Sequence, residues 1–336
     1  MNLICSFLVF VVLGGVIAGS AEVFQFPTAN RALLDGNGTD RFFVATPGRT
    51  WESGSYGCVR SDGHQLHEGV DIRCLERDSK GEPTDTVMST AEGVVVYVNR
   101  RPELSNYGNY LVVQHNVEGI EVFSLYAHLA EIRTSLRPGV HVRAGEKLGV
   151  MGRTSNTRTQ ISKERAHLHF EIALRLSDSF TRWFRERYPN LRNDHGEWNG
   201  QNLIGLDVVN LLREQARLGS GFSIHRFIAT QKELCRVQVR ATRFDYLGRY
   251  RAFVRDNPGA LAEGIAGYEL TLNYAGLPFV MVPRAASEMK NQGRFVLISV
   301  NAPEQAAHPC GKLVVKRGST WTLASNGERL LDLLTY

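Results

Sequence analysis

The chain has 336 residues, of which 43% are hydrophobic and 22% are charged. This length allows two domains or one large one, and the composition is that of a folded globular protein, which excludes an intrinsically disordered chain. The net charge is +5, which suits an anionic partner. It is too small to indicate nucleic-acid binding, and the sequence contains neither a basic cluster nor a nucleic-acid-binding motif.

The N-terminal segment is apolar. Residues 3–18 contain a single polar residue, Ser6, and small residues follow up to Ala21. This pattern predicts a signal peptide over residues 1–20, with cleavage near Ser20 or Ala21. The apolar run is shorter than the roughly 20 residues that a membrane span needs, so we expect an exported protein, periplasmic or secreted, without stable membrane insertion after cleavage. Because no Lys or Arg precedes the run, an uncleaved anchor is the alternative.

The cysteines also favour export. Cys5 falls in the predicted signal peptide, which leaves Cys58, Cys74, Cys235 and Cys310. An even number of cysteines is expected in an oxidising compartment. Three pairings are possible, and we favour the local pairs Cys58–Cys74 and Cys235–Cys310, because each bond then stays within one predicted domain. Free buried thiols are the alternative.

The first half of the chain has the pattern of a β protein. Residues 21–60 are polar and rich in glycine, and we expect an irregular lead-in there. Residues 61–218 are expected to form the first domain, with short strands separated by turn residues. The expected strands are residues 94–98, 110–115, 121–126, 147–152 and 167–174. Short strands at this spacing favour an antiparallel β-sheet or sandwich, so the expected fold class is mainly β with a few helices.

Two helices are expected near the end of this domain. Residues 178–188 have helical spacing and stop at Pro189, and a second helix begins at Asp207 and ends before Gly219. The Gly219–Ser220–Gly221 run is the best candidate for a domain boundary. Residues 219–336 are expected to form a smaller β-rich C-terminal domain of unknown role, with strands at residues 236–242, 268–273, 279–282, 294–300 and 313–316.

Two histidine motifs carry the candidate chemistry. His67 precedes Asp71 by four residues, and His167 precedes His169 by two. Both spacings place the side chains on one face of a β-strand. A catalytic zinc site needs three nitrogen or oxygen ligands and an open position for water, and these residues supply such a set with one His left for proton transfer. His67-Glu68 also begins like the helical His-Glu-x-x-His zinc motif, but the fifth position is Asp71, so we expect Glu68 to be a surface residue that points away from the metal.

The wider pattern resembles the lysostaphin/LytM-type zinc metallopeptidases, which cut peptidoglycan cross-bridges. The matching segments follow one another in the same order. They are Leu66-His67-Glu68-Gly69-Val70-Asp71, Gly93-Val94-Val95, Tyr107 to His115, Leu125-Tyr126-Ala127-His128-Leu129, Gly139 to Gly149 and His167-Leu168-His169-Phe170-Glu171. A lone His-x-His pair would be weak evidence, whereas this ordered set is specific.

The resemblance implies roles for individual residues. His67, Asp71 and His169 would bind one zinc ion per chain, on the floor of a groove in an antiparallel β-sheet. His128 and His167 would line the open coordination position. We assign His167 as the base that takes the proton from water and His128 as the residue that stabilises the oxyanion, with the reverse assignment as the alternative.

The segment before the His-x-His pair departs from the family pattern. Relatives have a short Gly-rich turn and a Pro there, whereas residues 153–166 are longer and basic. We expect this loop to form one wall of the groove, with nearby cations that would attract carboxylates of cell-wall peptides. These cations are Arg100, Arg101, Arg153, Arg158, Lys163 and Arg165. A solvated loop is the alternative.

Three classes of function fit these observations. The complete ligand set favours a zinc-dependent endopeptidase that hydrolyses the peptide stems or cross-bridges of bacterial peptidoglycan through a metal-activated water. The second class is a catalytically silent or latent cell-wall-binding module that regulates other murein hydrolases. The third is a metal-dependent hydrolase that acts on other proteins. We expect Trp183, Phe184 and Tyr188 to form the packing face of a helix, and the other histidines to be at the surface or hydrogen-bonded.

Overall fold

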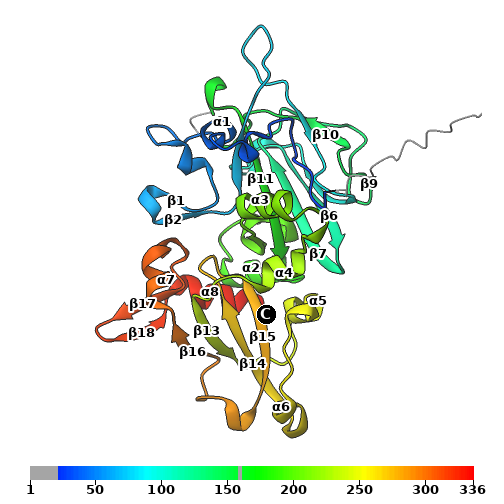
Figure 1. Cartoon of the computed structure of the whole chain (residues 1–336). Coiled ribbons are helices and arrows are strands. Elements are labelled where there is room, and N and C mark those ends of the chain that lie inside the picture. Colours follow the sequence, from blue (N-terminus) through cyan, green and yellow to red (C-terminus); the bar gives the residue numbers. More distant parts are fainter. Residues whose placement is uncertain (1–21, 158–160) are drawn as a thin grey trace, which may run out of the picture.

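The computed structural model describes residues 22–157 and 161–336. The predicted signal peptide and Arg158 lie outside these residues. Within the described part, no helix is long and apolar enough to cross a membrane. Figure 1 shows two units, one above the other, with the N-terminal part of the chain in blue to green and the C-terminal part in yellow to red.

The N-terminal unit is built on an antiparallel sheet, as the sequence predicts. The strand order is β12-β11-β7-β6-β5-β9, and β3 pairs with the first half of β11. The strands are β3 (Val70–Arg73), β5 (Gly93–Asn99), β6 (Tyr110–Val117), β7 (Ile120–Ala127), β9 (His141–Val142), β11 (His167–Arg175) and β12 (Leu203–Gly205). Each strand expected in this region is confirmed within a few residues, because short runs rich in apolar and β-branched residues, bounded by turn residues, mark buried strands.

Two smaller sheets complete this unit. One has the order β4-β10-β8, and the other is the hairpin of β1 and β2. Their bounds are β1 (Gly57–Arg60), β2 (Gln65–His67), β4 (Thr86–Met88), β8 (Glu131–Ile132) and β10 (Lys147–Val150). The expected irregular lead-in consists of short turns, the four-residue helix α1 (Thr39–Phe42) and strand β1.

Strand β11 shows how the sheet separates core from site. Leu168 and Phe170 are fully buried in the main hydrophobic core, as expected for the face opposite the histidines. The sheet is also covered on its other face, where Tyr110, Leu125 and their neighbours form a second, smaller core. Both faces of β11 are therefore inaccessible to bulk water over most of its length.

Helices close the N-terminal unit. They are α2 (Phe180–Arg187), α3 (Val208–Leu218) and α4 (Ile224–Ala229). The Asp207 carboxylate accepts a hydrogen bond of 3.0 Å from the backbone nitrogen of Asn210, which is the N-cap expected for α3. Trp183 and Phe184 are buried, so their side chains form a packing face, as predicted.

The C-terminal unit, residues 235–336, contains a second antiparallel sheet of order β15-β14-β13-β16 and the hairpin of β17 and β18. Its strands are β13 (Cys235–Val239), β14 (Ile265–Leu272), β15 (Pro278–Ala285), β16 (Phe295–Val300), β17 (Val314–Arg317) and β18 (Thr320–Leu323). Its helices are α5 (Asp245–Arg249), α6 (Pro258–Glu263), α7 (Ala302–Ala307) and α8 (Ser325–Leu334). The expected strands are present. The domain boundary at Gly219 remains a prediction.

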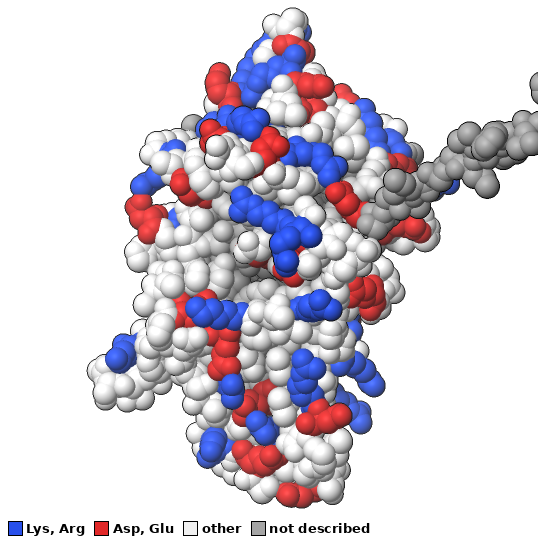
Figure 2. Space-filling model, in the orientation of Figure 1, with Lys and Arg blue, Asp and Glu red and all other residues white. Residues whose placement is uncertain are grey.

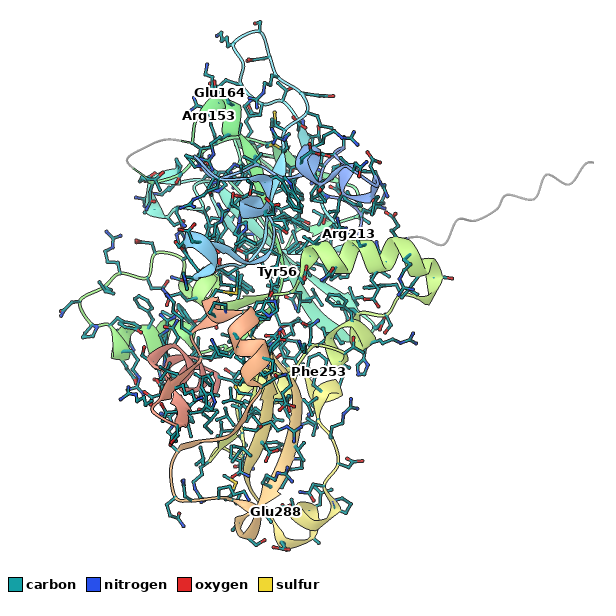
Figure 3. The ribbon with its side chains drawn as sticks, turned by 60° about the vertical axis from the view of Figure 1, so that its left-hand side comes forward. Tyr56, Arg153, Glu164, Arg213, Phe253 and Glu288 are labelled. Carbon is teal, nitrogen blue, oxygen red and sulfur yellow. A yellow bond between two sulfur atoms is a disulfide. The ribbon has the colours of Figure 1, made fainter. Side chains whose placement is uncertain are left out.

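The two units share one hydrophobic core, which runs from Phe180 and Trp183 to Leu331. Polar contacts join the same helices: Asp332 accepts hydrogen bonds of 2.8 Å from Trp183 Nε1 and 2.6 Å from Arg187 Nε. Tyr56, labelled in Figure 3, is buried near the junction.

The disulfide joins the two units, and the predicted local pairing is wrong. Cys58 in β1 is bonded to Cys310, whose Cα atom lies 5.2 Å away, while Cys74 and Cys235 are buried free thiols. The physical reason is that the 3₁₀ turn η11 (Pro309–Gly311) packs against β1 and β2. Sequence distance is a poor guide here, because the bond spans 252 residues.

Candidate metal centre

The strand register brings the predicted residues together. In the antiparallel ladder, His169 of β11 lies opposite Asp71 of β3 on one side and opposite Ala127 of β7 on the other. His128 follows Ala127 directly. His67 ends β2, and the two-residue link to β3 passes so close to β11 that a Cβ atom on Gly69 would lie 2.4 Å from the carbonyl oxygen of Phe170. Glycine at position 69 therefore allows His67 and Asp71 to reach one site from two strands, and the prediction that both lie on a single strand is wrong.

Three ligand atoms converge on one point. His67 Nε2 lies 3.2 Å from His169 Nδ1 and 3.3 Å from Asp71 Oδ1, and His169 Nδ1 lies 3.1 Å from Asp71 Oδ1. Tetrahedral zinc with bonds of about 2.0–2.1 Å has ligand atoms roughly 3.3–3.4 Å apart. All three side chains are buried. The donor set therefore fits a zinc ion in both chemistry and spacing.

Hydrogen bonds orient the two histidines that could bind the metal. His67 donates from Nδ1 to the carbonyl oxygen of Ser55 at 2.7 Å, and His169 donates from Nε2 to Glu171 Oε1 at 2.8 Å. Each ring therefore directs its other nitrogen, His67 Nε2 or His169 Nδ1, at the site. The Tyr107 hydroxyl donates to the same Glu171 oxygen at 2.8 Å. A carboxylate that holds a metal-binding imidazole in this way also increases its basicity.

Burial and opposite charges compete at the ligands. Burial tends to raise the pKa of Asp71, but His167, His67 and the hydrogen bond from His169 hold the pKa well below its usual range. Burial tends to lower the pKa of His169, but hydrogen bonds to Asp71 and Glu171 outweigh it and raise the pKa to about 10. The carboxylates thus create a strongly cation-attracting point among buried groups.

His128 and His167 face the same point. His167 donates from Nδ1 to the carbonyl oxygen of Arg165 at 2.6 Å, and His128 donates from Nδ1 to that of Thr154 at 2.9 Å. Neither Nε2 atom has a hydrogen-bond partner within residues 22–157 and 161–336, and the ring centroids are 4.8 Å apart. Burial lowers the pKa of both imidazoles, that of His128 well below its usual value. His128 has a φ of 61°, in the left-handed region that is rare for non-glycine residues.

The structure adds Arg60 to the site. Its Nη2 atom lies 2.5 Å from Asp71 Oδ2 and 3.1 Å from His67 Nε2. No sequence pattern marked this residue, because the contact depends on the β1–β2 hairpin. Glu171, in contrast, lies two residues after His169 on a strand, so the same spacing rule that linked the histidines would have found it.

Glu68 is exposed, as expected, but it lies along the groove that contains the candidate metal site. Loss of water around its carboxylate, together with the nearby charge of Glu171, raises its pKa.

The basic loop is mostly engaged in local contacts. Arg153 and Lys163 both pair with Glu82, at 2.9 and 3.3 Å. Arg101 pairs with Glu103, and Arg100 donates to the carbonyl oxygens of residues 133 and 136. Arg165 lines the groove, with Nε 2.9 Å from the carbonyl oxygen of Ala45. Of the described cations named for this wall, Arg165 is thus the one that the structure places in the groove.

The groove has a volume of about 1180 Å³ and extends beyond the metal site. Its lining includes His67, Asp71, His128, His167 and His169, and it also includes residues of η11 and α8 from the C-terminal unit. The predicted site residues are therefore all brought together in one open groove that both units line.

Comparison with known proteins identifies this region. Residues 65–179 match the model described as peptidase family M23. No curated protein matches the chain.

Solved structures with local similarity include three peptidases. A zinc-containing peptidase from Vibrio cholerae is 30% identical, over 32% of this chain and 26% of that chain, with a TM-score of 0.24. The catalytic domain of lysostaphin from Staphylococcus simulans is 24% identical, over 35% of this chain and 74% of that chain, with a TM-score of 0.25. A putative glycyl-glycine endopeptidase LytM from Ruminococcus gnavus is 27% identical, over 32% of this chain and 39% of that chain, with a TM-score of 0.24. The chain thus covers less than half of the first and third of these proteins.

Proposed function

From residues 65–179, which form a peptidase family M23 domain, we propose that the protein is a zinc-dependent endopeptidase that hydrolyses peptide stems or cross-bridges of bacterial peptidoglycan. The observation that carries the proposal is the convergence of His67 Nε2, Asp71 Oδ1 and His169 Nδ1, which all lie within 3.3 Å of one another. The order of motifs along the chain, which matches peptidoglycan-cleaving relatives, supports the substrate class.

His67, Asp71 and His169 would hold one zinc ion. When bound, zinc lowers the pKa of a coordinated water to about 7 and polarises the scissile carbonyl. Glu171 and the carbonyl oxygen of Ser55 hold the two imidazoles in the orientation that binding needs.

His167 and His128 would handle the proton and the developing charge. His167 has an open Nε2 atom 3.6 Å from Asp71 Oδ1, so it is placed to accept a proton from a water beside the ligands. His128 faces the same position from β7 and would donate to the oxyanion or to the leaving amine once protonated. The two rings are close enough that a proton on one disfavours a proton on the other.

An exported location fits the proposal. Cys58 and Cys310 form a disulfide, and disulfides persist mainly in oxidising compartments. We therefore propose a periplasmic or secreted enzyme, whose groove meets peptidoglycan outside the cytoplasm.

The test is release of peptides from purified peptidoglycan by the zinc-loaded protein, with and without a chelator. We expect release that the chelator abolishes and that added zinc restores, and the fragments will identify the bond. Zinc binding without release would contradict the proposed substrate. Casein digestion in place of peptidoglycan digestion would favour a general protease.

Two variants test the division of roles. His169→Ala removes a ligand and is expected to lose zinc, whereas His128→Ala is expected to keep zinc and to lose most turnover. Equal loss of zinc in both variants would contradict the separation of ligand and catalytic residues. The silent-module alternative has no support from the site, since all five predicted residues are present and face one another.

A further inference from the structure

The charge of the groove indicates which parts of a substrate it binds on either side of the bond that is cut. The basic residues that line it come from separate segments, and they are Arg60, Arg165, Arg192, Lys312 and Arg329. Two of these cations are neutralised by acidic lining residues. Arg60 pairs with Asp71 at 2.5 Å, and Arg192 pairs with Asp194 at 2.6 Å.

The remaining cations have no acidic partner in the described structure. Neither the ammonium of Lys312 nor the guanidinium of Arg329 makes a hydrogen bond or ion pair among the described residues, and Arg165 uses only Nε, toward the Ala45 carbonyl oxygen. The lining holds three acidic residues, Glu68, Asp71 and Asp194, against the five basic ones. The groove therefore has an excess of positive charge before any metal binds.

Lys312 is held close to the metal ligands by covalent and backbone contacts. His67 follows Leu66, which pairs with Cys58 across the β1–β2 hairpin. Cys58 is bonded to Cys310, and Lys312 follows two residues later with a φ of 51°. This short path fixes the backbone of Lys312 at the wall of the groove. Asn326 of α8 donates to the carbonyl oxygen of Gly311 at 3.4 Å, so the helix that carries Arg329 is anchored at the same place.

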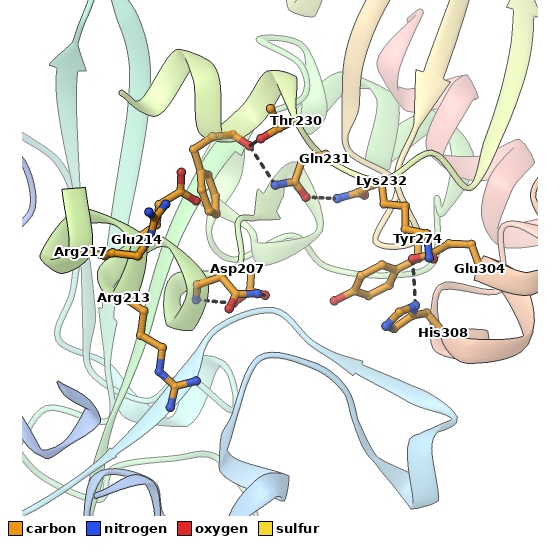
Figure 4. A pocket seen from close by; sticks show the side chains of 13 residues that line it. Asp207, Arg213, Glu214, Arg217, Thr230, Gln231, Lys232, Tyr274, Glu304 and His308 are labelled. Atoms are coloured by element: carbon orange, nitrogen blue, oxygen red, sulfur yellow. Dashed lines mark hydrogen bonds and ion pairs between the residues drawn. The ribbon is translucent and has the colours of Figure 1, made fainter. Parts of the chain in front are cut away.

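A second cavity, of about 550 Å³, lies between α3 and the C-terminal unit. It appears as the hollow between the two units in Figure 2, and Figure 4 shows its lining. Its lining holds as many acidic residues as Lys and Arg residues, three of each, and Glu304 contacts Lys232 at 2.5 Å and His308 at 2.9 Å. This cavity thus lacks the excess of cations found in the groove.

We propose that Arg165, Lys312 and Arg329 form a carboxylate-binding subsite, which selects peptidoglycan stem peptides with free carboxylates over uncharged glycine bridges. The inference rests on the proposed endopeptidase function and adds a role for the C-terminal unit, which supplies two of the three cations. Lys312 and Arg329 are specificity residues in this scheme, since they bind the substrate away from the reacting atoms.

The test uses two synthetic cross-linked stem peptides that differ only in amidation of their free carboxylates. Wild-type protein is expected to cleave the free acid with a kcat/KM at least about tenfold higher, as for loss of one charged hydrogen bond. In the double variant Lys312→Met/Arg329→Met, this ratio is expected to fall toward one through a higher KM for the free acid, with kcat and zinc content unchanged. Lys147→Met, which removes an exposed lysine outside the groove, is the control and is expected to keep the ratio.

Binding of the same two peptides, measured by calorimetry, separates this inference from the proposed function. If neither peptide is cleaved but the wild-type protein prefers the free acid and the double variant does not, the subsite holds and the endopeptidase proposal fails. Equal binding and equal cleavage of both peptides by the wild-type protein would overturn the subsite. So would a double variant that retains the full preference.

Discussion

The guanidinium of Arg60 contacts two of the three proposed zinc ligands at once, Asp71 through Oδ2 at 2.5 Å and His67 through Nε2 at 3.1 Å. The side chain is only 18% exposed, so water screens its charge weakly. Its N–H points at the nitrogen lone pair that zinc would use. Arg60 therefore balances the buried charge of Asp71 in the metal-free protein and opposes a second cation at the same place.

We predict that Arg60→Met raises the affinity for zinc. The variant removes both the competing hydrogen bond to His67 and the repulsion between two cations, so we expect a gain of about 10- to 100-fold. Competition with a chelator of known affinity measures this gain. Arg192→Met removes a groove cation that pairs with Asp194 instead of a ligand, and its affinity should equal that of the wild-type protein. A weaker affinity in Arg60→Met would show that Arg60 supports the ligands.

Glu171→Gln is predicted to weaken zinc binding while the fold stays intact. The glutamine keeps the shape but not the charge that orients the His169 ring and increases its basicity. Loss of such a partner costs about 10- to 100-fold in metal affinity. Glu68→Gln removes a neighbouring carboxylate that touches no ligand and should leave the affinity nearly unchanged. The same chelator competition measures both variants, and equal effects would contradict the role of Glu171.

Gly108→Ala is predicted to reduce turnover without loss of zinc. Gly108 has a φ of 63°, and a Cβ atom there would lie 2.2 Å from the carbonyl oxygen of Thr154, which accepts the hydrogen bond from His128. The chain must shift to relieve this clash, so we expect at least a tenfold loss of kcat, since ring misplacement by about 1 Å has larger effects. Gly119→Ala has a φ of 78° with open space around it and is the control for backbone strain alone. Unchanged turnover in Gly108→Ala would contradict this positioning of His128.

His115 is predicted to make stability depend on pH. Burial lowers the pKa of His115 to about 4, so in the folded protein the ring stays neutral while an unfolded chain would take up a proton near pH 6.5. The contribution of the neutral ring to the free energy of unfolding is therefore fully present above pH 6.5. It decreases as the pH falls to 4, by about 3 kcal/mol in total.

Urea denaturation of the wild-type protein and His115→Gln, both with chelator present, measures this contribution at pH 7 and pH 4.5. The difference in free energy of unfolding between the two proteins should shrink at the lower pH. A difference that does not change with pH would show that His115 does not titrate in this range.

Removal of the disulfide is predicted to destabilise the protein and to loosen the C-terminal wall of the groove. The bond links residues 252 apart, and a cross-link over a long loop contributes about 2–5 kcal/mol. Cys58→Ser/Cys310→Ser should lower the free energy of unfolding by this amount. Cys235→Ser is the control, because it replaces a buried cysteine that forms no disulfide. Peptide mapping of the oxidised protein checks the pairing itself. A Cys58–Cys74 peptide would contradict the structure.

Much of the fold could be predicted because local sequence patterns determine it. The strand around His115 is a short apolar run, the strand around His169 alternates histidine and apolar residues, and Asp207 and Pro189 mark helix ends. The disulfide could not be predicted, because Cys58 and Cys310 meet only when η11 packs on the β1–β2 hairpin. Short-range pairing is a reasonable guess from spacing alone, but tertiary packing decides which sulfurs are close.

The site could be predicted to the extent that strand periodicity and motif order define it. Asp71 and His169 share a site because β3 and β11 pair in register, and His128 joins them because Ala127 is opposite His169. His67 reaches the site from the end of β2. Arg60 could not be predicted, since its approach to Asp71 depends on three residues of positive φ, 61 to 63, which turn the hairpin.

The most direct test of the account is a crystal structure of the zinc-loaded protein with anomalous data collected at the zinc edge. We predict one peak per chain, within about 2.0–2.1 Å of His67 Nε2, Asp71 Oδ1 and His169 Nδ1, with the Nε2 atoms of His128 and His167 facing its open side. The absence of a peak, or a peak bound by His128 and His167 instead, would contradict the account.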